Sequence, residues 1–191
     1  MALTPSNMLA LGTAAPDFQL HDTDGKIITP GQFKAAPALV VMFICNHCPY
    51  VKHLRAGLAE FGRDCAAKGV AVVAINSNDA VNYPEDSPAK MAVEVTSAGY
   101  TFPYLHDESQ RVAKSFRAAC TPDFFLFDRG RRLVYRGQFD ASRPGNGIPV
   151  TGKDLRAAVE AVLKGSVPTL NQAPSIGCNI KWKPGNEPKH L

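Results

Sequence analysis

Two short, uninterrupted hydrophobic runs dominate the pattern of apolar and polar positions in this chain. Residues 38–44 and 70–75 are apolar throughout, and runs this short and uniform are typical of strands buried on both faces of a sheet. Between them, apolar residues recur at spacings of three and four from Val51 to Cys65, which predicts one face of an amphipathic helix. A strand, a helix and a second strand in this order predict a right-handed crossover between parallel strands.

Weaker patterns predict the other elements of the chain. Alternating residues around a turn at 22–26 predict an N-terminal strand hairpin, and a second hairpin is predicted around the turn at 128–131. Three shorter helices are predicted at residues 88–98, 107–117 and 155–163. We therefore expect an α/β fold in which a central mixed sheet is flanked by helices.

The last part of the chain has a different character. From Gly165 to Leu191 it is rich in proline and glycine and shows no periodicity, yet it contains the only tryptophan, Trp182. We therefore expect one domain at residues 1–164 and an irregular tail at 165–191 that packs on it. The N-terminal arm, residues 1–15, is also predicted to be irregular.

Two cysteines lie where the first buried strand should meet the helix. Cys45 and Cys48 are separated by Asn46 and His47, and Pro49 follows, a residue favoured at the first helical position. Free N–H groups and the helix dipole at this point stabilise a thiolate, so Cys48 is predicted to be a reactive nucleophile. A tight turn brings its first and fourth Cα atoms within roughly 7 Å, which is compatible with a disulfide between Cys45 and Cys48.

Composition narrows the class of protein. The 191 residues carry a formal charge of +4 and no basic run, so we expect no nucleic-acid partner. No segment approaches the ~20 apolar residues that a membrane span requires, and no basic n-region marks a secretory signal. We expect a cytoplasmic protein without a membrane partner. Five cysteines in such a chain indicate redox or metal chemistry rather than a disulfide scaffold.

The Cys-x-x-Cys motif before a helix and the pair Thr121–Pro122 before a strand hairpin resemble the thioredoxin-like superfamily. The start at residues 12–18 and the segment around Cys48–Pro49 are similar to its redoxin (AhpC/TSA, peroxiredoxin-like) branch. The resemblance implies a three-layer thioredoxin-like sandwich. It also implies that Pro122 is a cis-proline facing the cysteines and that Thr121 offers backbone groups to a substrate strand.

The resemblance also assigns roles to the cysteines. Cys48 occupies the nucleophile position, whereas Cys45 falls where peroxiredoxins carry a threonine or serine. The arginine that accompanies that hydroxyl has only one weak candidate, Arg117. Cys120, two residues before Pro122, and Cys178, in the tail, are candidates for a resolving thiol.

Three functions follow from these residues. The first is a thiol-disulfide oxidoreductase without a cofactor, in which Cys48 attacks a protein disulfide, Cys45 resolves the mixed disulfide, and a dithiol such as thioredoxin recycles the enzyme. The second is an antioxidant thiol peroxidase acting on peroxides through Cys48. The third is a metal-binding, copper-type module using Cys45, His47, Cys48 and His53. The oligomeric state has no signature in the sequence.

Overall fold

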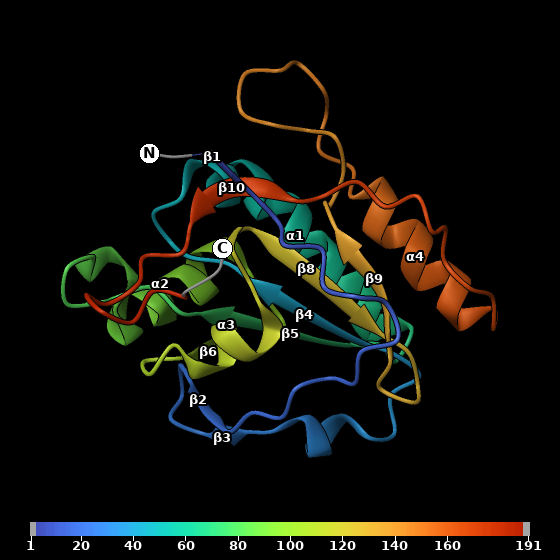
Figure 1. Ribbon diagram of the computed structural model, residues 1–191, viewed down its shortest axis with the longest axis horizontal. Helices are drawn as coiled ribbons and strands as arrows, with labels where there is room; N and C mark the ends of the chain where they lie inside the picture. Colours follow the sequence, from blue (N-terminus) through green and yellow to red (C-terminus); the bar gives the residue numbers. More distant parts are fainter. Residues whose placement is uncertain (1–2, 189–191) are drawn as a thin grey trace.

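The computed structural model describes residues 3–188, and within them a seven-stranded sheet forms the middle layer (Figure 1). Its strands are β2 (Leu20–Asp22), β3 (Ile27–Ile28), β4 (Leu39–Phe43), β5 (Ala71–Asn76), β6 (Tyr104–His106), β8 (Asp123–Phe127) and β9 (Leu133–Gly137). The strand order is β3-β2-β6-β5-β4-β8-β9. Strands β4, β5 and β6 are parallel, and the two strands at each end are antiparallel to their neighbours. The predicted mixed sheet and N-terminal hairpin are therefore confirmed.

Helices cover both faces of this sheet. They are α1 (Pro49–Ala67), α2 (Pro88–Ala98), α3 (Arg111–Phe116) and α4 (Lys153–Leu163), with the 3-10 turns η1 (Pro30–Phe33) and η2 (Pro84–Asp86). α1, α2 and α4 pack on one face and α3 on the other. None of the helices within residues 3–188 combines the length and hydrophobicity that crossing a bilayer requires.

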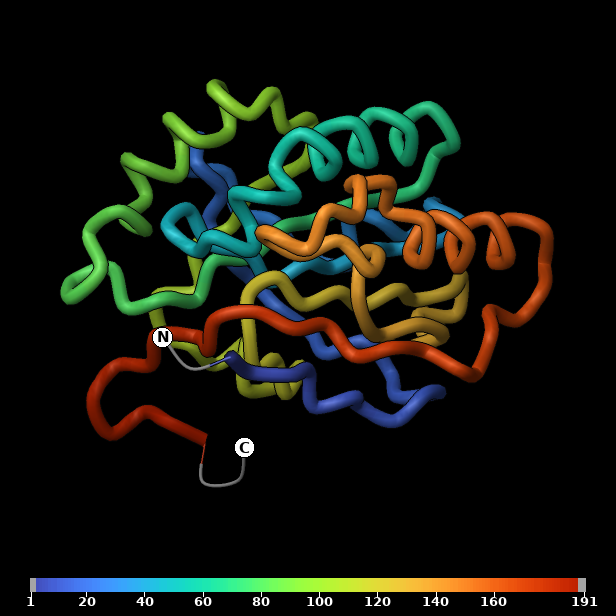
Figure 2. The backbone as a smooth tube through the Cα atoms, turned by 90° about the horizontal axis from the view of Figure 1, so that it is seen from above, coloured from blue at the N-terminus to red at the C-terminus, as the bar shows by residue number. Residues whose placement is uncertain are grey.

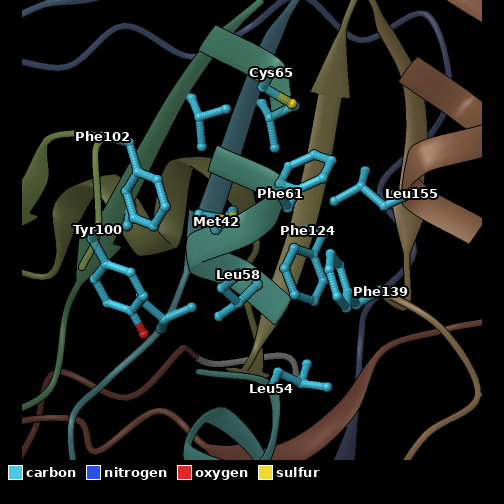
Figure 3. Packing of buried hydrophobic residues seen from close by; sticks show 14 of the residues in the cluster. Met42, Leu54, Leu58, Phe61, Cys65, Tyr100, Phe102, Phe124, Phe139 and Leu155 are labelled. Carbon is cyan, nitrogen blue, oxygen red and sulfur yellow. The ribbon is translucent and has the colours of Figure 1, made fainter. Parts of the chain in front are cut away.

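The central strand β4 divides the core into two layers because its side chains alternate between the faces. Val40 and Met42 point towards α1, and Val41 and Phe43 point towards α3. Figure 3 shows Met42 and Phe124 of the sheet packed against α1 and its neighbours. All five β4 residues are fully buried, and each buried side chain of this size stabilises the fold by about 1.5–3 kcal/mol. This rigid centre holds the strand-to-helix junction in place.

Helix α1 begins and ends as its sequence predicts. Cys48 is the N-cap, with φ −65° and ψ 124°, and Pro49 occupies the first helical position. After the helix, Gly69 adopts the left-handed conformation, with φ +70°, which a residue without a Cβ enters at little cost. The buried residues of α1 include Val51, Leu58 and Cys65, so the periodic stripe in the sequence is the face that packs on the sheet.

A second, smaller sheet joins the two ends of the described chain. It consists of β1 (Leu3–Pro5), β10 (Ile176–Asn179) and β7 (Cys120–Thr121), in the order β1-β10-β7, with antiparallel pairing. Figures 1 and 2 both show β1 running alongside β10. The N-terminal arm and the tail, both expected to be irregular, therefore each contribute a strand. These strands are short and lack alternation, and their pairing is decided by tertiary contacts that no local pattern reports.

Candidate active site

The two cysteines of the motif lie side by side at the carboxyl end of β4. Cys45 is in the turn after the strand and Cys48 caps α1, with 1% and 0% of their surfaces exposed. Cys45 Sγ lies 3.3 Å from Thr121 Oγ1. As a thiol, Cys48 donates to the Thr121 carbonyl oxygen at 3.2 Å. The structure thus places Thr121 against both sulfurs.

The Thr121–Pro122 peptide bond is cis, the isomer that the sequence resemblance implied. The backbone of Thr121 also forms part of the small sheet, where it is paired in register with Cys178 of β10. The strand position beside Thr121, where the resemblance implied a substrate, is therefore taken by the chain's own tail.

Hydrogen bonds stabilise Cys48 as a thiolate. The Cys45 thiol makes the largest contribution, and together with the Cys178 thiol and the N–H groups of Val51 and Cys178 it lowers the pKa of Cys48 from 9.0 to about 4, against the opposing effect of burial. Burial first, then the neighbouring Cys48, raise the pKa of Cys45 well above its ordinary value. No cationic side chain is among these main causes for Cys48, so N–H and S–H donors at the helix start activate it.

A buried carboxylate anchors the turn between the cysteines. Asp86, which ends η2 and is fully buried, accepts a hydrogen bond from the Asn46 N–H at 2.7 Å and lies 2.5 Å from His47 Nδ1. Its second oxygen also accepts from Asn78 Nδ2 at 2.8 Å. Sequence reasoning missed Asp86, because a lone acid in a proline-containing excursion has no spacing relative to the motif. Its Pro84-Glu85-Asp86 context was the only available signal.

Asp86 also changes the expected set of metal ligands. One ligand atom each from Cys45, His47 and Asp86 lies within 4.8 Å of the others, so these three could hold a metal ion. His53 belongs to a different contact, because its Nε2 lies 2.7 Å from Ser142 Oγ. The structure therefore supplies the distant ligand that the motif alone lacks, but not through His53.

The remaining sequence candidates lie at different places. Cys178 lies next to Cys48, as described above. Cys120 is fully buried in β7, its Sγ lies 3.5 Å from the Pro122 carbonyl oxygen, and burial raises its pKa well above the ordinary value. Arg117 caps the end of α3, the helix that packs on the sheet face opposite α1.

A second buried acid, Asp123, follows the cis-proline. It is completely buried, its Oδ1 has no hydrogen-bond partner, and burial raises its pKa from 3.8 to about 7. Because the folded-state pKa is raised, the ionised carboxylate destabilises the folded protein and the neutral acid does not. The loss of folding free energy therefore grows as the pH rises from about 4 to about 7 and is then constant.

We expect Asp123→Asn to be more stable than the wild type above about pH 7, by roughly 4 kcal/mol at 1.36 kcal/mol per pKa unit. The difference should shrink steadily as the pH falls towards 4, because Asp123 is then neutral in both states. Denaturant unfolding of the two proteins across this pH range measures it. A difference that does not change with pH would contradict the assignment.

The sequence of this chain is similar to a known protein family and to a curated plant protein. Residues 11–136 match the model of the AhpC/TSA family. The curated rice protein peroxiredoxin Q, chloroplastic (Oryza sativa subsp. japonica), is 25% identical over 107 residues, which are 55% of this chain and 45% of that protein. The chain therefore matches less than half of its curated relative's length.

Solved structures are similar over most of the chain. A hypothetical protein from Sinorhizobium meliloti 1021 is 59% identical, with a TM-score of 0.94 over 95% of this chain and 100% of that one. An uncharacterized conserved protein from Geobacillus kaustophilus is 54% identical, with a TM-score of 0.95 over 97% and 98%. The thioredoxin domain of a thiol-disulfide oxidoreductase from Bacteroides vulgatus is 18% identical, with a TM-score of 0.63 over 81% and 99%. The last similarity confirms the thioredoxin-like fold.

Proposed function

Because this chain belongs to the AhpC/TSA family, we propose that it is a thiol-disulfide oxidoreductase in which Cys48 is the nucleophile and Cys45 the resolving thiol. The observation that carries the proposal is the position of Cys48 at the N-cap of α1, with Cys45 in the turn just before it and Thr121 against both sulfurs; hydrogen bonding from Cys45 is the largest cause that lowers the pKa of Cys48. A thiolate paired with a protonated neighbouring thiol is the arrangement that disulfide exchange requires.

The first step forms a mixed disulfide. The Cys48 thiolate attacks one sulfur of a substrate disulfide, and the second substrate sulfur leaves as a thiolate that takes up a proton. Cys45 stays protonated at this stage, because burial and the charge and hydrogen bond of Cys48 raise its pKa. Thr121 lies against both sulfurs, and because its backbone is paired with β10, the substrate disulfide must reach Cys48 without pairing with Thr121.

The second step releases the substrate. Once Cys48 is in a disulfide it no longer carries a charge, so two of the causes that raise the pKa of Cys45 disappear. Cys45 then attacks Cys48 Sγ, which forms the Cys45–Cys48 disulfide and breaks the bond between Cys48 and the substrate, and the proton of Cys45 passes to the departing substrate thiolate. Reduction back to the dithiol needs an external dithiol, for which we propose a thioredoxin-type protein in a reducing compartment such as the cytoplasm.

Reaction with a chromogenic aromatic disulfide, dithiobis-nitrobenzoate, tests this order of events. In a Cys178→Ser variant, which keeps only Cys45 and Cys48 in the site, attack and resolution should release two equivalents of nitrothiobenzoate. In a Cys45→Ser/Cys178→Ser variant the reaction should stop after one equivalent, with the other still attached to Cys48. Cys48→Ser gives the background from other thiols. One equivalent from both variants would rule out Cys45 as the resolving thiol.

A thiol peroxidase is the second candidate, favoured by the similarity to peroxiredoxin Q. In that reaction the Cys48 thiolate attacks a peroxide oxygen, the O–O bond breaks, and the other oxygen leaves as an alcohol or water after taking up a proton. The Cys48 sulfenic acid is then captured by a neighbouring thiol with loss of water. Stopped-flow oxidation by hydrogen peroxide separates the candidates. Rapid second-order oxidation of Cys48 would favour the peroxidase, and slow oxidation with fast disulfide exchange would favour the oxidoreductase.

The metal content of the purified protein tests whether Cys45, His47 and Asp86 hold a metal ion.

A further inference from the structure

Strand β10 brings a third cysteine to the Cys48 sulfur. Cys178 lies opposite Thr121 in the antiparallel register, the Thr121 carbonyl oxygen lies 3.2 Å from Cys48 Sγ, and both cysteines belong to the same buried cluster. Hydrogen bonding from the thiol and the backbone N–H of Cys178 is among the causes that lower the pKa of Cys48. Only 3% of Cys178 and 0% of Cys48 is exposed, so the contact is closed to solvent. Cys48 therefore has one thiol neighbour in its own motif and a second that arrives from the opposite end of the chain.

The contact depends on an unusually close approach of β10 to Thr121. A Cβ atom on Gly177 would lie 2.0 Å from the Thr121 carbonyl oxygen, a distance that only glycine tolerates. Flanking bonds hold the strand on both sides: Ser175 Oγ donates to the Pro122 carbonyl at 2.6 Å, and the Ile180 N–H donates to the Ala119 carbonyl at 3.1 Å. Strand β1 pairs along the other edge of β10. Cys178 is thus fixed at Cys48 by contacts along the whole strand.

We propose that Cys178 is a second resolving thiol, which competes with Cys45 for the Cys48 sulfur; this inference rests on the proposed function. Starting from the Cys45–Cys48 disulfide, Cys178 sulfur attacks Cys48 Sγ, the Cys48–Cys178 bond forms and the Cys45–Cys48 bond breaks. The proton of Cys178 passes to the departing Cys45 thiolate. The exchange needs no external oxidant or reductant, and it links β10 covalently to the start of α1.

The same attack resolves a mixed disulfide between Cys48 and a substrate, with the substrate thiolate as the leaving group. Cys178 is held inactive in the reduced protein, because burial and the adjacent Cys48 raise its pKa to about 12. When Cys48 enters a disulfide its charge and hydrogen bond are lost, while Lys181 continues to favour the Cys178 thiolate. Cys178 therefore becomes a better nucleophile only after Cys48 has been oxidised.

The decisive comparison is Cys45→Ser against Cys45→Ser/Cys178→Ser, using the same chromogenic disulfide. In Cys45→Ser, attack by Cys178 should release the second equivalent at least about tenfold faster than any second equivalent appears in the double variant. The attack by Cys178 is intramolecular, whereas the double variant depends on thiols of other molecules. Peptide mapping under non-reducing conditions should then find a Cys48–Cys178 disulfide. A Cys45→Ser protein that stays at one equivalent with a stable Cys48 adduct would overturn the inference.

This outcome is distinguishable from failure of the proposed function. If Cys178→Ser releases two equivalents and Cys45→Ser only one, Cys45 resolves and the inference about Cys178 is wrong. If Cys178→Ser releases one and Cys45→Ser two, Cys178 resolves and the assigned role of Cys45 is wrong. Cys120→Ser is the matched control for loss of a buried thiol, and it should behave as the wild type.

A second variant tests the position of Cys178 without removing its sulfur. In the Cys45→Ser background, Gly177→Ala should push β10 away from Thr121. The first equivalent should then be released faster, because Cys48 is uncovered, and the second more slowly, because Cys178 is no longer held there. Release of additional equivalents would reveal exposure of the buried Cys65 and Cys120 and hence general unfolding. An unchanged second step in a folded variant would contradict the role of β10.

Discussion

Replacing Cys48 by serine is expected to abolish disulfide exchange, with a loss of at least about 1000-fold, because a serine hydroxyl stays protonated where the thiol does not. The same substitution should remove the thiolate absorbance that we expect for the reduced wild type in the far ultraviolet above about pH 5. This band should titrate with a midpoint near the pKa of about 4 that we assign to Cys48. Matched titrations of wild type and Cys48→Ser measure both effects.

The source of the low pKa can be tested in the same titration. Cys45 supplies the largest stabilising hydrogen bond to the Cys48 thiolate, so Cys45→Ala should move the midpoint upwards. Cys178→Ala should also move it upwards, by less, because its thiol contributes less than that of Cys45. A wild-type midpoint near 9, the ordinary value for cysteine, would show that these hydrogen bonds do not activate Cys48.

Replacing Asp86 by alanine is expected to destabilise the protein by roughly 3 kcal/mol, because it leaves three buried or half-buried donors without their acceptor, at about 1–3 kcal/mol for each buried one. The affected donors are the Asn46 N–H, Asn78 Nδ2 and the ring N–H of His47. The cost should be largest near neutral pH. Although burial opposes ionisation, hydrogen bonds from His47 and Asn78 hold the pKa of Asp86 below 3.8, so its stabilisation is lost as the pH falls through that lower value.

Denaturant unfolding of Asp86→Ala beside Asp24→Ala gives the control. Asp24 is an exposed acid that lies 3.5 Å from Lys26, and its removal should change stability by less than about 0.5 kcal/mol. Asp86→Asn keeps the volume and one acceptor oxygen, and it should lower the pKa of Cys45, which the Asp86 charge helps to raise. Equal stability of Asp86→Ala and the control would show that this carboxylate does not anchor the turn.

The central part of the fold could be predicted from the sequence because local and tertiary preferences coincide there. Residues 38–44 are apolar throughout and pack on both faces, so one hydrophobic run identified β4. The apolar stripe from Val51 to Cys65 predicted α1, and Pro49 predicted the residue at which it begins. The position of Cys48 at the N-cap follows from these two elements, and with it the identity of the nucleophile we propose.

Which segments meet at Cys48 was decided by tertiary structure, because the sequence named Thr121 and Cys178 only through a resemblance and did not indicate Asp86. Asp86, Thr121 and Cys178 come from three segments that meet at the carboxyl end of β4. Cys120 and Cys178 were equal candidates in the sequence. Of these two, Cys178 alone is among the causes that lower the pKa of Cys48. The strand that carries Cys178 has four residues, one of which is a glycine. A strand so short is stable only when its edge partners are present, so its place beside Thr121 had to come from the folded molecule.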